Sequence, residues 1–126
     1  LMVESELCPV FLVAPTTPDS RIKSIVEHGK GFIYYVSREG VTGMQSKVSG
    51  NISSMIDRIH QHTDLPIAVG FGISNPDQAK AVAEMGDAIV VGSAIVNQIA
   101  EQGKSDTLVP TVSQFVGSLA QAVKEV

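Results

Sequence analysis

The chain has 126 residues, of which 44% are hydrophobic and 17% charged; this composition excludes a disordered chain and fits one domain with one core. Thirteen acidic and nine basic residues give a formal net charge of −4, and the basic residues are scattered, which argues against a nucleic-acid-binding or membrane-binding surface. One cysteine, Cys8, excludes an internal disulfide framework and favours a cytoplasmic protein, and no apolar run is long enough to cross a bilayer.

Four short apolar runs alternate with four stretches whose apolar residues recur at helical spacing. In chain order the sequence predicts a strand over Val10–Ala14, a helix over 18–28, a strand over Phe32–Val36, a helix over 52–62, a strand over Ile67–Val69, a helix over 76–85, a strand over Ala88–Val91 and a helix over 111–126. The apolar runs do not alternate with polar residues, so they fit strands buried on both faces of a parallel sheet. Short buried helical segments are the alternative.

Helix-capping residues stand at several of these boundaries. Thr17-Pro18-Asp19 and Asn75-Pro76-Asp77 both read as a cap, a proline at the first helical position and an acid in the first turn. Gly29 and Gly86 follow helical stretches and can close them.

Repeated strand–helix units require a parallel sheet with right-handed crossovers. The fold class is therefore α/β, and two architectures compete: an open doubly wound sheet and a (β/α)8 barrel. Four units make a thin open sheet, and they are also half of a barrel, which typically needs about 250 residues.

In both architectures the functional site lies at the carboxyl ends of the strands. Gly72 follows the third strand, and Gly92 and Ser93 follow the fourth, just before a short apolar stretch, Ala94–Ala100, that predicts an extra helix. Free amides and the dipole at such a helix N-terminus favour a phosphate. We interpret these residues as a phosphate site; plain turn glycines and a serine cap are the alternative.

The polar stretch 37–50 is long for a loop in a compact domain, and we interpret it as a lid over the site, against an ordinary flexible crossover. Thr42 and Gly43 within it could reach back toward the phosphate. Tyr34 in the second strand and Phe71 after the third could each line a pocket or fill the core.

Catalytic groups are harder to find. Glu39 is the one carboxylate near these strand ends, and we interpret it as a solvated loop charge rather than a catalytic base. His28, His60 and His62 fall at helix ends or on helix faces and are expected at the surface. No His, Cys and Asp residues have the spacing of metal ligands, and Cys8 lacks the context of a nucleophile. We therefore expect phosphate binding without a metal and without a catalytic acid–base pair.

Taken together, the motifs resemble the tryptophan synthase alpha subunit over about residues 9–126. The resemblance rests on five segments in the same order and spacing: Pro9–Thr17 (PVFLVAPTT), Gly31–Ser37 (GFIYYVS), Gly40–Gly43 (GVTG), Leu65–Ser74 (LPIAVGFGIS) and Val91–Val96 (VGSAIV).

This resemblance implies a (β/α)8 barrel that cleaves indole-3-glycerol phosphate to indole and glyceraldehyde 3-phosphate in tryptophan biosynthesis. It also implies a beta-subunit partner that carries pyridoxal phosphate, so the chain itself needs no cofactor. The family's phosphate-binding positions correspond to Gly43, Phe71, Gly72, Gly92 and Ser93, its active-site tyrosine to Tyr34 and its lid threonine to Thr42.

The family's two catalytic carboxylates lie in the first half of its barrel, and nothing before residue 9 matches them. We therefore expect residues 1–126 to supply the last four strand–helix units, with residues 1–8 a remnant of the preceding helix or foreign sequence. The chain does not begin with Met, and we expect it to be incomplete. Alone it should be inactive and should pair with the missing amino-terminal half or with itself, since a half barrel leaves two sheet edges unpaired. Another phosphate-binding barrel enzyme, acting on a ribulose-type phosphate, and a non-catalytic phosphate-binding module remain alternatives.

Overall fold

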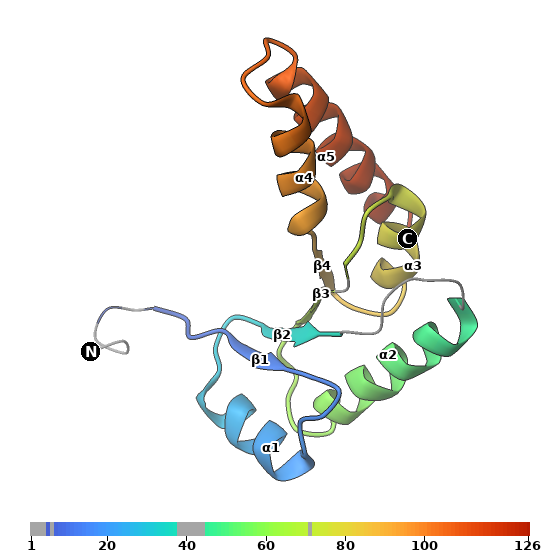
Figure 1. Cartoon of the computed structure of the whole chain (residues 1–126). Coiled ribbons are helices and arrows are strands. Elements are labelled where there is room, and N and C mark those ends of the chain that lie inside the picture. The colour runs from blue at the N-terminus through green and yellow to red at the C-terminus, as the bar shows by residue number, and fades with distance from the viewer. Residues whose placement is uncertain (1–4, 6, 38–44, 71) are drawn as a thin grey trace.

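A computed structural model describes residues 5, 7–37, 45–70 and 72–126 of the chain, with residues 45–50 described by their backbone alone. Parallel strands form one sheet in the order β1-β2-β3-β4, and a helix follows each strand (Figure 1). In chain order the elements are β1 (Phe11–Val13), α1 (Asp19–His28), β2 (Ile33–Val36), α2 (Gln45–His60), β3 (Ile67–Gly70), α3 (Pro76–Ala83), β4 (Ala88–Val90), α4 (Ser93–Gln102) and α5 (Leu108–Lys124). The predicted alternation of strands and helices is therefore confirmed.

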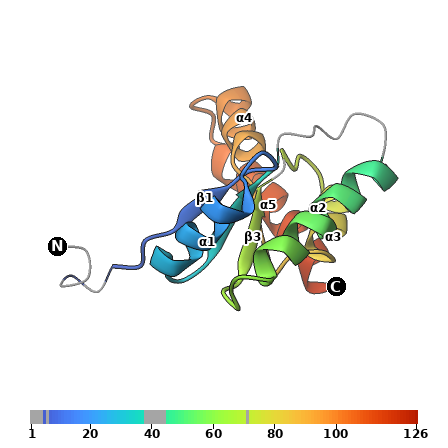
Figure 2. The ribbon, with the colours of Figure 1, turned by 90° about the horizontal axis from the view of Figure 1, so that it is seen from below.

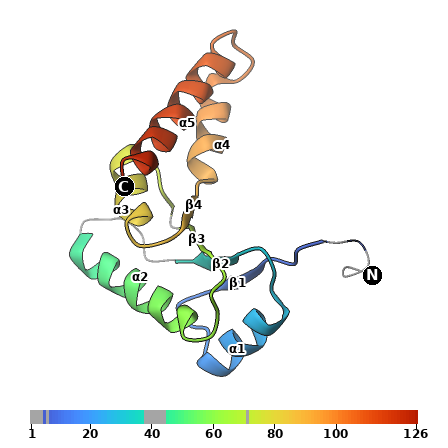
Figure 3. The same ribbon diagram turned by 180° about the vertical axis from the view of Figure 1, so that it is seen from behind.

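Side chains of the sheet divide into a helix-covered face and an open face, because successive residues of a strand point to opposite sides. The strand residues in the buried core all belong to the first face: Val13, Ile33, Tyr35, Ile67 and Val69. They pack against helix residues that include Ile22, Ile52, Ile59, Val82 and Leu119. The helices that contribute to this core, α1, α2, α3 and α5, thus pack on one side of the sheet. Helices α2 and α3 lie on the same side of β3 in all three views (Figure 1, Figure 2 and Figure 3).

We define the open face by the residues that alternate with that core: Leu12, Tyr34, Val36, Ala68, Gly70, Ala88 and Val90. Leu12 is 59% exposed and Ala88 is exposed, whereas all four residues of β3 are buried. The expectation of strands buried on both faces is therefore correct for β3 and wrong for β1, β2 and β4. On the open face of β3, the ring of Tyr34 from β2 covers Gly70.

Several helix starts differ from the sequence prediction. The helix predicted over 111–126 begins three residues earlier, at Leu108, because Pro110 is tolerated in the first turn of a helix. The extra helix predicted from Ala94 begins at Ser93. The helix predicted over 52–62 begins at Gln45, so that residues 45–50 of the expected lid are helical. The sequence is compatible with this earlier start, since Val48 lies one helical turn before Ile52. The glycine and serines around Val48 interrupt the apolar helical spacing, so the pattern did not predict it. At α1, Pro18 rather than Thr17 is the cap residue, and the Thr17 hydroxyl instead accepts a hydrogen bond from the Ala14 amide (3.0 Å).

Other boundaries follow their capping residues closely. The Asn75 side chain accepts from the Gln78 amide (2.9 Å) at the start of α3, as predicted. Gly86 lies beyond the end of α3, and its lack of a side chain serves close packing: a Cβ there would lie 2.7 Å from Cγ2 of Val69. The sequence interpretation of Gly86 as a helix-closing residue was therefore incomplete.

The last two helices lie side by side and extend away from the sheet (Figure 1 and Figure 3). Leu119 and Ala122 of α5 are buried, and α5 also packs on α3, so that the carboxyl-terminal end of the chain lies beside α3. The extra helix predicted over Ala94–Ala100 is confirmed as α4. None of the helices in the described part of the chain has the length and apolar content that a membrane crossing requires.

Candidate functional site

Two exposed glycines, Gly72 and Gly92, follow the carboxyl ends of the adjacent strands β3 and β4. Gly70 of β3 pairs with Val90 of β4, so Gly72 and Gly92 each lie two residues past a paired position. A Cβ on either glycine would meet no other atom within 4 Å. Gly72 also has a φ of +64°, a left-handed conformation that favours glycine. The sheet therefore ends here in open backbone that a ligand can approach closely.

Helix α4 begins inside this opening. Gly92 is its cap residue, with Ile95 and Val96 amides donating to the Gly92 carbonyl at 3.0 and 3.1 Å. The amides that precede them have no acceptor within the helix. Among the described residues, no side chain caps this end and its first turn holds no acid, whereas the start of α3 has Asn75. The uncapped amides and the helix dipole make this end suited to an anion such as phosphate.

Ser93 is the first residue of α4 and is exposed at the same opening. Its hydroxyl stands where a second donor could reach an anion held by the α4 amides. The structure thus brings three of the predicted phosphate-binding residues, Gly72, Gly92 and Ser93, to one edge of the sheet.

Tyr34 lies on the open face in β2, the strand that pairs with β3. It pairs with Ala68, and its ring covers Gly70: a Cβ on Gly70 would lie 2.6 Å from Cε2 and 2.8 Å from Cζ of Tyr34. Tyr34 is half-buried, whereas Tyr35 is buried on the helix-covered face. Of the two roles open from sequence, the wall of a pocket fits this position better than a place in the helix-packed core.

Three predicted site residues, Thr42, Gly43 and Phe71, lie outside the described residues, as does Glu39. The histidines His28, His60 and His62 are all exposed, as expected. Cys8 is exposed and forms no disulfide. Within the described ranges, no three His, Cys, Asp or Glu side chains gather in a way that could hold a metal ion.

Two residues of the site region escaped the sequence interpretation. Gly70 has no signal of its own, because the need for glycine there comes from a ring on the neighbouring strand. Arg58 of α2 donates to Asp19 and to the carbonyl of Thr17 near the carboxyl end of β1. Asp19 had been interpreted only as a first-turn helix acid, and it is also this ion-pair partner. The contact spans 39 residues of sequence, so no local pattern reveals it.

Comparison with known proteins gives one consistent family. The family model described as tryptophan synthase alpha chain matches residues 1–124. A relative of that name from Opitutus terrae is 47% identical over 116 residues, covering 91% of this chain and 44% of the relative. Another, from a Cyanothece species, is 50% identical over 117 residues, covering 92% of this chain and 43% of the relative.

Solved structures agree. The crystal structure of the tryptophan synthase alpha chain from Legionella pneumophila matches with a TM-score of 0.82 and 30% identity, over 98% of this chain and 45% of that one. The match includes all four strand–helix units, and it confirms the expected (β/α)8 barrel type, of which these residues supply about half. The chain spans less than half the length of the curated relatives it matches.

Proposed function

This chain belongs to the tryptophan synthase alpha chain family, and from that premise we propose that it serves a carbon–carbon lyase that cleaves indole-3-glycerol phosphate into indole and glyceraldehyde 3-phosphate. The observation that carries the proposal is the open backbone of Gly72 and Gly92 beside the uncapped start of α4. A phosphate group carries the charge and the acceptor oxygens that such a site stabilises. The substrate contains one phosphate, at one end of the molecule.

Each described site residue then has a role. The amides at the start of α4 bind the phosphate beside the open backbone of Gly72, and the Ser93 hydroxyl adds a further donor. Tyr34 forms one wall of the pocket on the open face. On the resemblance alone, we propose that Gly43 and Phe71 also border the phosphate and that Thr42 belongs to a lid.

We assign no catalytic carboxylate to this chain, because the resemblance places the family's two catalytic carboxylates outside the segments that match here. We propose that the 126 residues alone bind the substrate's phosphate without cleaving the substrate, and that they pair with an amino-terminal half or with a second copy. Leu12 is exposed, and β1 and β4 each pair with one strand, so both have an edge that another strand could join. These features support such association.

Partner, cofactor and location are proposed from the family. We propose a beta-subunit partner that receives the indole and carries pyridoxal phosphate, no cofactor in the alpha chain itself, and a cytoplasmic location. Of the two alternatives from sequence, a different phosphate-binding barrel enzyme would have the same glycine site, and family membership favours the lyase.

The test is indole release from indole-3-glycerol phosphate by the protein as the cell makes it. Ser93→Asp places a negative charge at the start of α4, which favours the helix but repels the phosphate. The variant also removes the hydrogen bond that the Ser93 hydroxyl would donate to the phosphate. A hydrogen bond to a charged group contributes about 1.5–3 kcal/mol, so we expect the KM for indole-3-glycerol phosphate to rise about 10–100-fold. Urea unfolding should show that the variant is as stable as the parent.

Ser105→Asp is the matched control, because it adds the same charge in the exposed turn at the other end of α4. Its KM should not change. No indole from a parent protein that contains the amino-terminal half would contradict the lyase assignment. Indole release with equal KM in the parent and in Ser93→Asp would instead contradict the phosphate site.

A further inference from the structure

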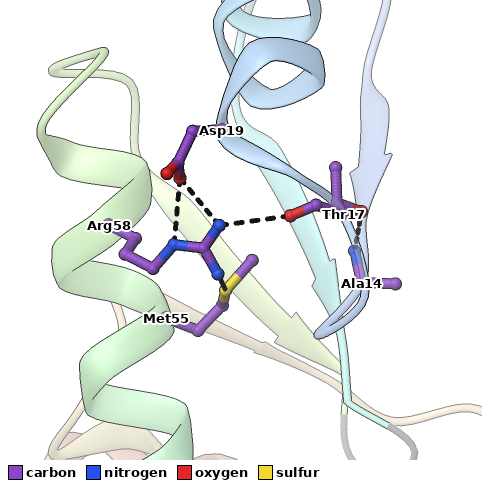
Figure 4. A network of polar contacts seen from close by, with 5 residues as sticks. All are labelled: Ala14, Thr17, Asp19, Met55 and Arg58. Atoms are coloured by element: carbon purple, nitrogen blue, oxygen red, sulfur yellow. Dashed lines mark hydrogen bonds and ion pairs between the residues drawn. The ribbon is translucent and has the colours of Figure 1, made fainter.

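The Arg58 guanidinium joins helix α2 to the turn after β1 and to the first residue of α1 (Figure 4). Arg58 donates from Nε and Nη2 to Oδ1 of Asp19 at 3.0 and 2.7 Å, and from Nη2 to the carbonyl of Thr17 at 3.3 Å. Its Nη1 also lies 3.3 Å from Sδ of Met55, one turn earlier in α2. A planar fork with several donors can hold all these partners at once, which a lysine ammonium cannot.

The turn that Arg58 holds is closed by its own hydrogen bonds. The Thr17 amide donates to the Ala14 carbonyl (2.9 Å), and the Ala14 amide donates to the Thr17 hydroxyl (3.0 Å). The turn follows Val13, which pairs with Tyr35, so Ala14 comes level with Val36 on the open face. It therefore forms the rim of the site on the β1 side.

A cavity of about 230 Å³ lies beside this rim, lined by Pro15, Tyr35, Asn51, Ser54, Met55 and Arg58. The guanidinium spans the gap between the turn and α2. Its side chain is 37% exposed and that of Asp19 is 67% exposed, so the ion pair contributes little to overall stability. Its effect is to set where the turn lies.

We propose that Arg58 is a positioning residue that holds the rim turn Ala14–Thr17 against the end of the substrate remote from the phosphate. This inference rests on the proposed function. Strands are about 4.8 Å apart, so the turn after β1 lies about 10–15 Å across the sheet from the phosphate site after β3 and β4. The substrate's apolar ring system extends in that direction, over the open face with Tyr34 and Leu12.

The experiment compares Arg58→Gln with the parent protein, as the cell makes it, on two ligands. With indole-3-glycerol phosphate, kcat/KM should fall about 10–100-fold, as expected when a contact is displaced by about 1 Å. With glycerol 3-phosphate, which keeps the phosphate end and lacks the ring, the inhibition constant should change less than about twofold, a difference under 0.5 kcal/mol. A general loss of structure would change both constants together.

Two further variants sharpen the result. Asp19→Asn should lower kcat/KM less than Arg58→Gln, because the bond from Arg58 to the Thr17 carbonyl remains. Lys80→Gln is the matched control: it breaks another exposed ion pair, from Lys80 of α3 to Glu125 just after α5 (3.8 Å), away from the rim turn. Its kcat/KM should equal that of the parent.

Amide hydrogen exchange measures directly how firmly the turn Ala14–Thr17 is held, and the measurement does not require an active enzyme. In Arg58→Gln, the amides of Ala14 and Thr17 should exchange at least tenfold faster, while those of β3 stay protected. Unchanged exchange of both amides, or an unchanged kcat/KM in an active parent, would overturn the inference. Faster exchange in a protein that releases no indole would contradict the proposed function while keeping the role of Arg58 in holding the turn.

Discussion

Substitution of Gly70 by alanine tests the arrangement of the open face most directly. The new Cβ would lie 2.6 Å from Cε2 and 2.8 Å from Cζ of Tyr34. Carbon atoms in contact prefer about 3.5–4.0 Å, so the ring would have to retreat by about 1 Å. Tyr34 is half-buried and the contact is with the outer end of its side chain, so the ring can turn aside in part. We therefore expect a cost of about 1 kcal/mol, the lower end of the range for overpacking. With a urea m-value of about 1–3 kcal/mol/M, the unfolding midpoint should fall by about 0.3–1 M.

The cause can be isolated by a double-mutant cycle with Tyr34→Ala, followed by urea unfolding. Without the ring, Gly70→Ala should cost less than about 0.5 kcal/mol, so that most of its effect appears as coupling between the two positions. Gly92→Ala is the matched control, since its Cβ meets nothing within 4 Å and its φ is −119°; its stability should change by less than about 0.5 kcal/mol. An equal cost of Gly70→Ala with and without Tyr34 would refute the steric explanation.

Further predictions concern single contacts, each measured by urea unfolding. Asn75→Ala removes the acceptor for the Gln78 amide and should cost about 1 kcal/mol, whereas Asn75→Ser should cost much less. Asp87→Ala leaves the Ile67 amide at the start of β3 without its side-chain acceptor (2.8 Å) and should cost about 1–3 kcal/mol, with Asp87→Asn retaining most of the stability. Gly117→Ala, inside α5 with open space around it, should stabilise the protein by about 1 kcal/mol. Destabilisation by Gly117→Ala would mean that another part of the protein packs on that face of α5.

Much of the fold follows from local signals in the sequence. Short apolar runs, helical spacing and the Asn75-Pro76-Asp77 boundary predicted the alternating strands and helices, because hydrogen bonding and side-chain period act over a few residues. The glycines Gly72 and Gly92 were also readable, since positions after parallel strands fall at one edge of the sheet whatever the details of packing.

Other features depend on residues that are distant in sequence. The start of α2 at Gln45 was missed because helix formation there depends on the rest of a long helix, more than on the residues at its start. The open face was not predicted because a continuous apolar run is compatible both with a strand buried on one face and with a strand buried on both faces.

The sequence by itself determined which elements form, in what order, and which strand ends carry Gly72 and Gly92. Only the tertiary structure decided that Gly70 lies beneath the ring of Tyr34, and that Arg58 donates to the Thr17 carbonyl, 41 residues away in the sequence. The physical reason is range: capping and periodicity are set by neighbours along the chain, whereas steric exclusion and hydrogen bonding between elements exist only once the sheet and its helices have come together.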